Sequence, residues 1–194
     1  MGKEWRRLMT VSAKNSSKER DQELLLAVAG GNRRALEELY LSYHRRLARF
    51  LSRFTQRYEN VEEIINDTFM VVWQSAKDFR YASQVSTWII GIAYRTALKS
   101  LRRQKNHSGA RSLDDYPEQT TDPTLEAEVQ DWLTHGLNQL SIEQRLTLEL
   151  AYHMGHSLEE IAAITQCPVG TVKARMFHAR EKLRSYLPAL SGAG

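Results

Sequence analysis

The stretch 157–187 constrains the fold more than any other part of the chain, because it has the pattern of two short helices joined by a tight turn. Ser157, followed three residues later by Glu160, forms a capping box that begins the first helix. The turn covers residues 165–167. Pro168 suits the first position of the second helix, where its missing N–H lacks a partner in any case. The pattern therefore predicts a helix-turn-helix.

The second of these helices has two different faces. A stripe expected to be buried consists of Val172, Met176, Ala179 and Leu183. The other face mixes cations, small residues and an aromatic ring, which suits the reading of base edges in a major groove. Its candidate DNA-contacting residues are Thr171, Lys173, Ala174, Arg175, Phe177, His178 and Arg180. The alternative is an ordinary solvated amphipathic helix. We expect Gly170 to allow the two helices to approach closely.

The chain of 194 residues is long enough for two small helical domains. Its net charge of +4 is distributed unevenly: residues 1–105 are strongly basic, residues 106–136 are acidic and the rest is almost neutral. A basic first region favours a polyanionic partner. The sequence has no apolar run of membrane-spanning length, no secretory signal and a single cysteine, Cys167. We therefore expect a cytoplasmic protein without an internal disulfide and without stable membrane insertion.

The basic region is expected to form a mobile extension followed by one compact bundle. Residues 1–20 are polar and lack sustained periodicity, and either Met1 or Met9 fits as the native start. Apolar periodicity then predicts four helices, at 21–31, 33–54, 61–79 and 87–105. The third begins with a polar cluster that complements the helix dipole or merely caps and solvates it: Glu62, Glu63, Asn66 and Asp67. The fourth has an apolar back and a basic front, which suits a phosphate backbone.

The acidic region separates this bundle from a second helical domain. Residues 106–124 contain Gly and Pro and little periodicity, which predicts a flexible linker. Helical patterning resumes at residue 125, and Ser141 with Gln144 forms a second capping box. We expect residues 125–190 to form a small domain that contains the helix-turn-helix. No strand pattern is visible, so the predicted fold class is all-α.

The sequence lacks the motifs of common enzymes and cofactor sites. It has no H-E-x-x-H, no G-x-S-x-G and no Gly-rich phosphate loop, so we expect no catalytic activity and no cofactor. The spacing of His153, His156 and Cys167 matches no standard zinc set. Cys167 lies at a helix N-terminus, where redox sensing is conceivable, but a small turn residue is the favoured interpretation.

Three blocks of this sequence read VEEIINDTFMVVW, then DFR followed by STWIIGIA, and finally SLEEIAAITQCPVGTVKARMFHAREKL. Together they closely resemble the extracytoplasmic-function (ECF) subfamily of bacterial RNA polymerase sigma factors. The resemblance covers nearly all of residues 21–187. It implies sigma region 2 at 21–105 and sigma region 4 at 125–190, which together direct core RNA polymerase to promoters. It also implies an anti-sigma factor as a partner, and a stress or envelope regulon.

The resemblance assigns expected roles to individual residues. Those expected to face core polymerase are Glu62, Glu63, Asn66 and Asp67. Those expected at the downstream (minus-10) element, where an extruded base is held, are Arg80, Tyr81, Ser83, Trp88, Arg95, Lys99, Arg102 and Arg103. The helix 168–183, with the seven candidate residues given above, is expected in the major groove of the upstream (minus-35) element.

Departures from the family pattern fall on the downstream-element residues. Tyr81 follows Arg80 where the family often has Gly, Val85 replaces an aromatic residue, and Arg95 replaces a common Asn. Asn66 stands where Gln is usual. These changes leave the preferred downstream sequence open.

Two mechanisms fit the sequence. In the first, the linker spans on the order of 25–30 Å, so the free protein rarely holds both promoter elements, which lie more than about 34 Å apart. Polymerase then sets the separation of the lobes. In the second, the chain is a helix-turn-helix regulator that acts without polymerase. The polar cluster of the third helix favours the first mechanism, because a regulator that acts without polymerase has no need of this cluster.

Overall fold

A computed structural model describes residues 2–55, 57–107, 136–137 and 139–186, with side chains described from residue 16 on and not at 104–107 or 186. The regular elements in these ranges are all helices, which confirms the predicted all-α fold. None of the helices described is long and apolar enough to cross a membrane.

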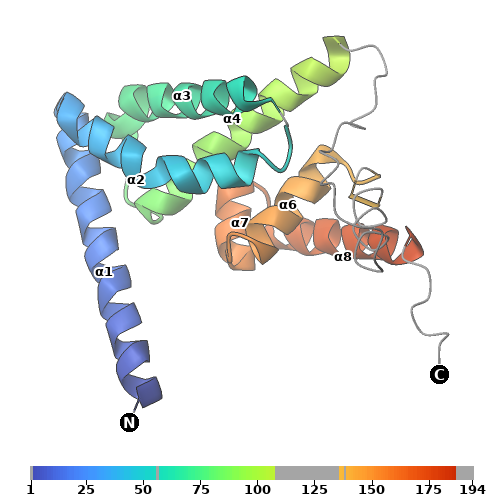
Figure 1. The fold of residues 1–194 in the computed structure, drawn as a ribbon, viewed down its shortest axis with the longest axis horizontal. Helices are drawn as coiled ribbons and strands as arrows, with labels where there is room; N and C mark the ends of the chain where they lie inside the picture. The colour runs from blue at the N-terminus through green and yellow to red at the C-terminus, as the bar shows by residue number, and fades with distance from the viewer. Residues whose placement is uncertain (1, 56, 108–135, 138, 187–194) are drawn as a thin grey trace, which may run out of the picture.

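The N-terminal lobe contains four α-helices and one short 3-10 helix. They are α1 (Gly2–Ala29), α2 (Arg33–Leu51), α3 (Tyr58–Ser75), η1 (Ala76–Asp78) and α4 (Val85–His107). Asn32 caps α2 as expected, because its side chain accepts hydrogen bonds from the N–H groups of Arg34 and Ala35. Gly31, at φ +88°, makes the turn from α1. Helix α3 packs against both α2 and α4 (Figure 1).

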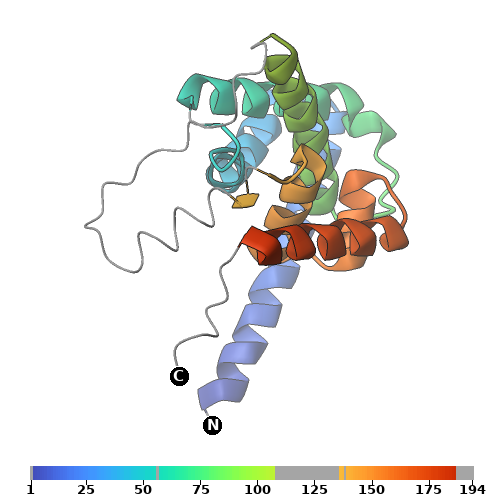
Figure 2. The same ribbon diagram turned by 90° about the vertical axis from the view of Figure 1, so that its right-hand side faces the viewer.

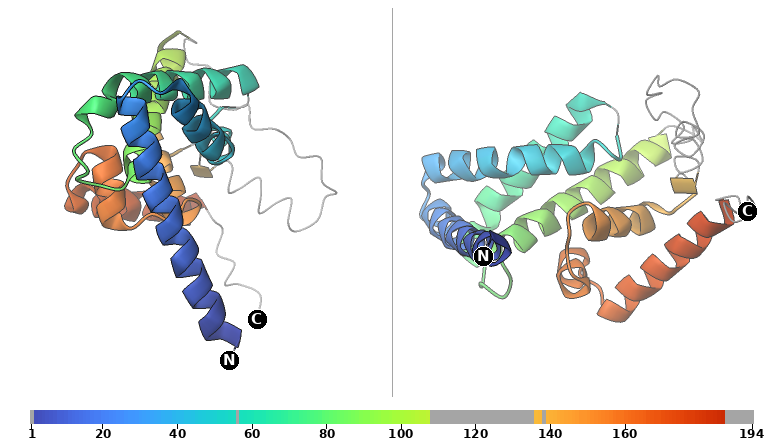
Figure 3. Two further views of the ribbon diagram at one scale, coloured as in Figure 1. Left: turned by 90° about the vertical axis from the view of Figure 1, so that its left-hand side faces the viewer. Right: turned by 60° about the horizontal axis from the view of Figure 1, so that its bottom comes forward.

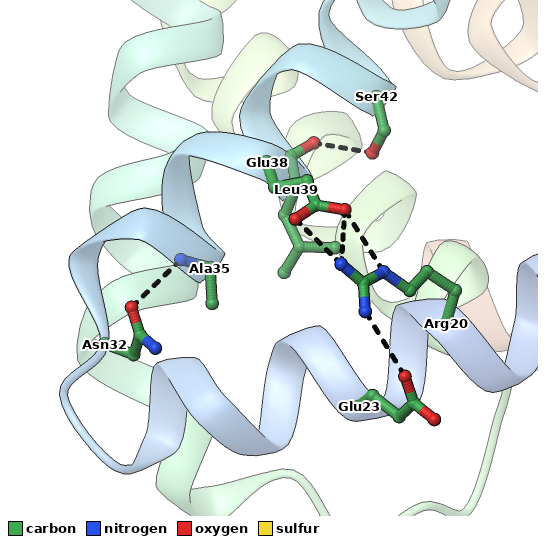
Figure 4. Close-up of polar contacts among 7 residues, drawn as sticks. All are labelled: Arg20, Glu23, Asn32, Ala35, Glu38, Leu39 and Ser42. Atoms are coloured by element: carbon green, nitrogen blue, oxygen red, sulfur yellow. Dashed lines mark hydrogen bonds and ion pairs between the residues drawn. The ribbon is translucent and has the colours of Figure 1, made fainter.

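Helix α1 differs from the expectation of a mobile extension over residues 1–20. Residues 2–20 continue the helix, and its N-terminal part projects away from the bundle (Figure 3). Arg20 connects α1 to α2 by hydrogen bonds of 2.8 and 2.9 Å to the Glu38 carboxylate, and it also lies 3.4 Å from Glu23 (Figure 4). Beyond this exposed contact, Leu25 and Val28 anchor α1 in the core.

The C-terminal lobe contains α6 (Ile142–Tyr152), α7 (Leu158–Thr165) and α8 (Val169–Tyr186). Both predicted capping boxes are confirmed, at Ser141–Gln144 and Ser157–Glu160. Helix α8 begins one residue later than expected, and the Pro168 carbonyl accepts hydrogen bonds from the first turn. The linker at 108–124 and the start of the expected domain at 125–135 lie outside the described residues, whereas residues 106 and 107 complete α4.

The two lobes pack directly against each other, through α4 on one side and α7 and α6 on the other. One hydrophobic core runs through both lobes. Helix α4 lies beside α6 and α7 (Figures 1 and 2). The two predicted domains are therefore in direct contact, in addition to being joined along the chain. The cause is α4, whose residues Ile89, Ile90, Ala93 and Ala97 are fully buried and surround more of the helix than one neighbour can cover.

A glycine permits this close approach, but it is not the one expected. A Cβ added at Gly91 on α4 would lie 3.4 Å from the Ile164 carbonyl oxygen on α7. A Cβ added at Gly170 would meet nothing within 4 Å, so the expectation for Gly170 is wrong. Gly91 therefore fixes the spacing of the two lobes.

Candidate nucleic-acid interface

Helix α8 presents an exposed face opposite its buried stripe. Val172 and Ala179 are fully buried and Met176 nearly so, as predicted, and α8 packs on α6 and α7 through this side. Figure 2 shows α8 in front, along the outside of the lobe. The turn before it is closed by Gln166, which adopts a left-handed φ of +53° and ends α7.

Six of the seven candidate DNA-contacting residues on α8 are exposed: Thr171, Lys173, Ala174, Phe177, His178 and Arg180. The Phe177 ring, 60% exposed, meets the His178 ring edge-on with a centroid distance of 5.5 Å. The guanidinium of Arg180 lies 5.9 Å from the centre of the Tyr152 ring. This surface offers cations together with an apolar ring, which is the chemistry that reads base edges and thymine methyl groups.

Arg175 is the exception on α8. It is half-buried, and its guanidinium lies 3.7 Å from the Cys167 sulfur at the turn. The Thr165 hydroxyl also lies 3.1 Å from that sulfur. Arg175 is close enough to Tyr94 on α4 to act on the pKa of this phenol, which burial raises. In this arrangement Arg175 is directed toward the lobe interface.

The candidate residues for the downstream element come from the η1–α4 loop and from α4. Arg80 and Tyr81 are exposed, Ser83 is half-buried, and the Trp88 ring lies on the Phe79 ring at a centroid distance of 5.0 Å. On α4 itself, Arg95, Lys99, Arg102 and Arg103 are exposed. Partial burial nevertheless lowers the pKa of Arg95.

Arg102 is engaged by the other lobe. Its guanidinium donates a hydrogen bond of 2.5 Å to Glu143 at the start of α6. This contact lowers the pKa of Glu143 against the opposing effect of its own partial burial. One candidate phosphate contact of the N-terminal lobe is therefore occupied by a carboxylate of the C-terminal lobe.

The polar cluster on α3 divides into two pairs. Glu62 lies 2.9 Å from His44, and Asn66 accepts a hydrogen bond of 3.2 Å from Tyr40, so both face α2. Glu63 and Asp67 are exposed and directed away from this contact. Sequence reasoning missed Met70, which is 58% exposed and lies one turn beyond Asp67. Glu63, Asp67 and Met70 follow one another at helical spacing, and this spacing could have predicted that Met70 lies on the same face.

A buried charge cluster ties the lobes together. Arg145 on α6 is 4% exposed, donates a hydrogen bond to the Arg53 carbonyl after α2, and lies 5.2 Å from the centre of the Phe54 ring. Glu149 lies 3.3 Å from the Arg53 side chain and 2.8 Å from His153. Burial lowers the pKa of Arg145 to about 10 and raises that of Glu149.

A second contact between the lobes involves a histidine. His156 lies 3.4 Å from Arg46 on α2 and 3.4 Å from Glu160 on α7. Burial and the Arg46 charge lower the pKa of His156, and Glu160 opposes this effect. A neutral imidazole therefore suits this site.

Comparisons with known proteins agree with this geometry. The Sigma-70 region 2 model matches residues 39–107, and the Sigma-70 region 4 model matches residues 130–183. The ECF RNA polymerase sigma factor SigM of Mycobacterium tuberculosis is 34% identical over 88% of this chain and 86% of its own length. The RNA polymerase sigma-H factor of Pseudomonas aeruginosa is 30% identical over 90% of this chain and 97% of its own.

Two solved structures that share this fold are complexes with a second protein. CnrH, bound to the cytosolic domain of CnrY, covers 89% of this chain and 99% of its own with a TM-score of 0.64 and 24% identity. RpoE, bound to the anti-sigma factor NepR from Bartonella quintana, covers 79% of this chain and 97% of its own with a TM-score of 0.58 and 25% identity. By its two matched regions and its full-length relatives, the chain belongs to the ECF family of RNA polymerase sigma factors.

Proposed function

We propose that the chain gives core RNA polymerase its promoter specificity through three separate surfaces. Helix α3 binds polymerase, the η1–α4 loop and α4 bind the opened downstream element, and α8 reads the upstream element. The observation that carries this proposal is the exposed face of α8, where Phe177 and five other candidate residues lie opposite the buried side chains of Val172, Met176 and Ala179. The chain acts in the cytoplasm, and the chemistry of RNA synthesis belongs to polymerase alone.

On α3 the polymerase contact is centred on Glu63, Asp67 and Met70. These residues are exposed on one face of the helix, whereas Glu62 and Asn66 are engaged with α2. We assign Glu62 and Asn66 the task of fixing the angle between α2 and α3. A methionine beside carboxylates provides an adaptable apolar contact within a charged surface, which suits a protein partner.

Promoter binding requires the two lobes to separate. In the packed arrangement Arg102 is paired with Glu143, and α4 is covered by α7 around Gly91. The promoter elements lie more than about 34 Å apart, so a chain with packed lobes cannot place α4 and α8 on both elements. Polymerase therefore supplies the free energy that opens the interface by binding the separated lobes more tightly.

A protein inhibitor of the anti-sigma class is the second expected partner. RpoE, which shares this fold, was solved in complex with the anti-sigma factor NepR, and CnrH was solved in complex with the cytosolic domain of CnrY. We propose that an inhibitor of this kind holds the present chain away from polymerase and thereby controls a stress or envelope response.

Run-off transcription with reconstituted holoenzyme tests the proposed function. Promoters are first selected from random DNA with the holoenzyme, and core polymerase alone is the control. We expect transcripts only when the chain is present. A helix-turn-helix regulator is the second candidate, favoured by the fully formed α7–α8 pair. It would be supported if the chain bound its operator at full strength and showed no affinity for core polymerase.

A further inference from the structure

The ring of His156 lies between the two lobes, and its two nitrogens face different lobes. The side chain is only 6% exposed, and its Nδ1 lies 3.4 Å from the Glu160 carboxylate on α7, within the same lobe. Its Nε2 lies 3.4 Å from the guanidinium of Arg46 on α2, in the N-terminal lobe. The imidazole is therefore held in its own lobe through one nitrogen and contacts the other lobe through the second.

The two partners determine which nitrogen carries the proton of the neutral ring. A guanidinium can only donate hydrogen bonds, so Nε2 of His156 must accept from Arg46. The ring proton then lies on Nδ1, which faces Glu160. The N–H of Ser157 donates a hydrogen bond of 2.9 Å to the same carboxylate oxygen and fixes its position. The nitrogen that would take up a second proton is therefore the one that points across the lobe interface.

Protonation of Nε2 would turn this contact from attractive to repulsive. Its N–H would meet the N–H groups of Arg46, so a hydrogen bond would be replaced by two facing donors that both carry positive charge. In separated lobes Nε2 would meet water, while Nδ1 would keep Glu160 within its own lobe. Burial, followed by the Arg46 charge, lowers the pKa of His156 in the packed arrangement. The packed lobes are therefore stabilised at neutral pH and lose this stabilisation as the pH falls below about 6.5.

Helices α1 and α2 place further titratable groups around this contact. Lys18 acts on the carboxylate of Glu160, and Asp21 acts on the guanidinium of Arg46. Burial raises the pKa of Asp21, so acid also removes the carboxylate that partly compensates the Arg46 charge. The phenol of Tyr43, whose pKa burial raises, stays neutral. These groups act in the same direction as the imidazole or do not titrate near neutral pH.

Helix α6 carries a group whose effect has the opposite sign. Glu149 lies 3.3 Å from Arg53 of α2 and 2.8 Å from His153, and burial raises its pKa. A carboxyl group with a raised pKa takes up its proton more readily in the packed arrangement, so acid acts through Glu149 to favour packing. A comparison with a variant at position 156 is therefore needed to isolate the imidazole.

We propose that His156 is a proton-sensitive switch between the lobes: protonation of Nε2 in mild acid opens the interface and releases Arg102 from Glu143. The opening depends on the geometry of the interface alone. Its consequence for polymerase rests on the proposed function, in which polymerase binds the separated lobes. A fall in pH thus increases the fraction of the chain that polymerase can bind.

Scattering and circular dichroism of the free full chain test the opening. Between about pH 7.5 and about pH 5.5, the radius of gyration of the wild type should increase while its helix content stays constant. His156→Gln should keep the smaller radius throughout, because its amide oxygen accepts from Arg46 and does not titrate. His178→Gln is the matched control. It removes an exposed histidine of α8 and should expand in acid as the wild type does.

Binding to core polymerase tests the consequence of the opening. The ratio of wild-type affinity to His156→Gln affinity cancels any effect of pH on polymerase itself. This ratio should rise by about 2- to 30-fold between about pH 7.5 and about pH 6.0, the upper value being the limit for uptake of a single proton. In addition, the ¹⁵N shifts of the ring at neutral pH should show the proton of His156 on Nδ1.

The proposal is overturned if the wild type keeps its radius in acid, or if His156→Gln expands as the wild type does. It is also overturned if helix content falls together with the expansion, because the chain would then unfold and not open. A proton on Nε2 at neutral pH would equally refute it. Expansion with an unchanged affinity ratio would refute the link from opening to polymerase. Absence of wild-type transcription at every pH, in contrast, refutes the proposed function itself.

Discussion

Replacing Arg145 by methionine tests how the two lobes are held together. The guanidinium donates to the Arg53 carbonyl, faces Glu149 and lies 5.2 Å from the centre of the Phe54 ring. A hydrogen bond from a charged donor is worth about 1.5–3 kcal/mol, and a desolvated cation–π contact adds up to about 2 kcal/mol. Methionine recovers part of the apolar contact and avoids the cost of burying a cation, so we expect Arg145→Met to destabilise the fold by about 2–4 kcal/mol.

Thermal and urea unfolding of the full chain measure this change. For a chain of this size, the expected loss corresponds to a decrease in Tm of about 4–16 °C. Arg53 still pairs with Glu149 in the variant, which keeps the loss below that of an isolated buried charge. A double variant, Arg145→Met with Glu149→Gln, should be destabilised by less than the sum of the single changes because the two residues interact. A loss below about 0.5 kcal/mol for Arg145→Met would refute the assignment of this cluster as a structural tie.

The same substitution should affect polymerase binding in the opposite direction. If polymerase selects the separated lobes, a weaker interface raises the population of the binding-competent state and hence the apparent affinity. Arg145→Met should therefore unfold at a lower temperature and bind core polymerase more tightly. A simultaneous fall in stability and in affinity, in a variant that remains folded at the assay temperature, would contradict the opening step.

Two further predictions concern α8, α4 and the lobe interface. Lys173→Ala should change the preferred upstream sequence at a cost of about 1–3 kcal/mol in binding free energy for the best site. Arg103→Ala should instead weaken binding to all sequences and reduce the slope of log affinity against log salt concentration by about 1. Equal losses of affinity across promoter variants for both substitutions would contradict these separate roles. Because the pKa of His156 is lowered in the fold by burial and Arg46, the folded state takes up a proton less readily, and stability should fall as the pH decreases below about 6.5. His156→Gln should remove this decrease in Tm. The lowered pKa of Glu160 also makes stability depend on pH, but only at pH values below its ordinary 4.5, so the two effects can be distinguished.

Helix boundaries could be predicted from the sequence where they depend on neighbouring residues. The two capping boxes and the Asn32 cap each join groups three or fewer residues apart, so their geometry follows from local sequence. The buried stripe of α8 follows equally from helical spacing. In such cases local pattern and tertiary packing agree, and the sequence alone is sufficient.

Side-chain pairings between helices could not be predicted in this way. Glu62 meets His44 across 18 positions, and Arg102 meets Glu143 across 41. By helical spacing alone, Glu62 and Glu143 could equally be solvent-exposed. Their pairing is determined by the packing of a second helix, which the local sequence does not specify. The sequence signal for contact between the lobes lies in α4. The run from Ile89 to Ala93 is apolar around the helix, so it must be covered on two sides.

The packed lobes also bring together residues of the two proposed DNA-binding surfaces. Arg102 of the downstream surface is occupied by Glu143, and Arg175 of the upstream helix is turned toward the interface near Tyr94. Opening the lobes would release Arg102 from Glu143, whereas Arg175 keeps its contact with Cys167 inside its own lobe. The free protein should consequently bind the downstream element weakly. An isolated chain whose affinity for promoter DNA is unchanged by Glu143→Gln would show that the interface does not restrain Arg102.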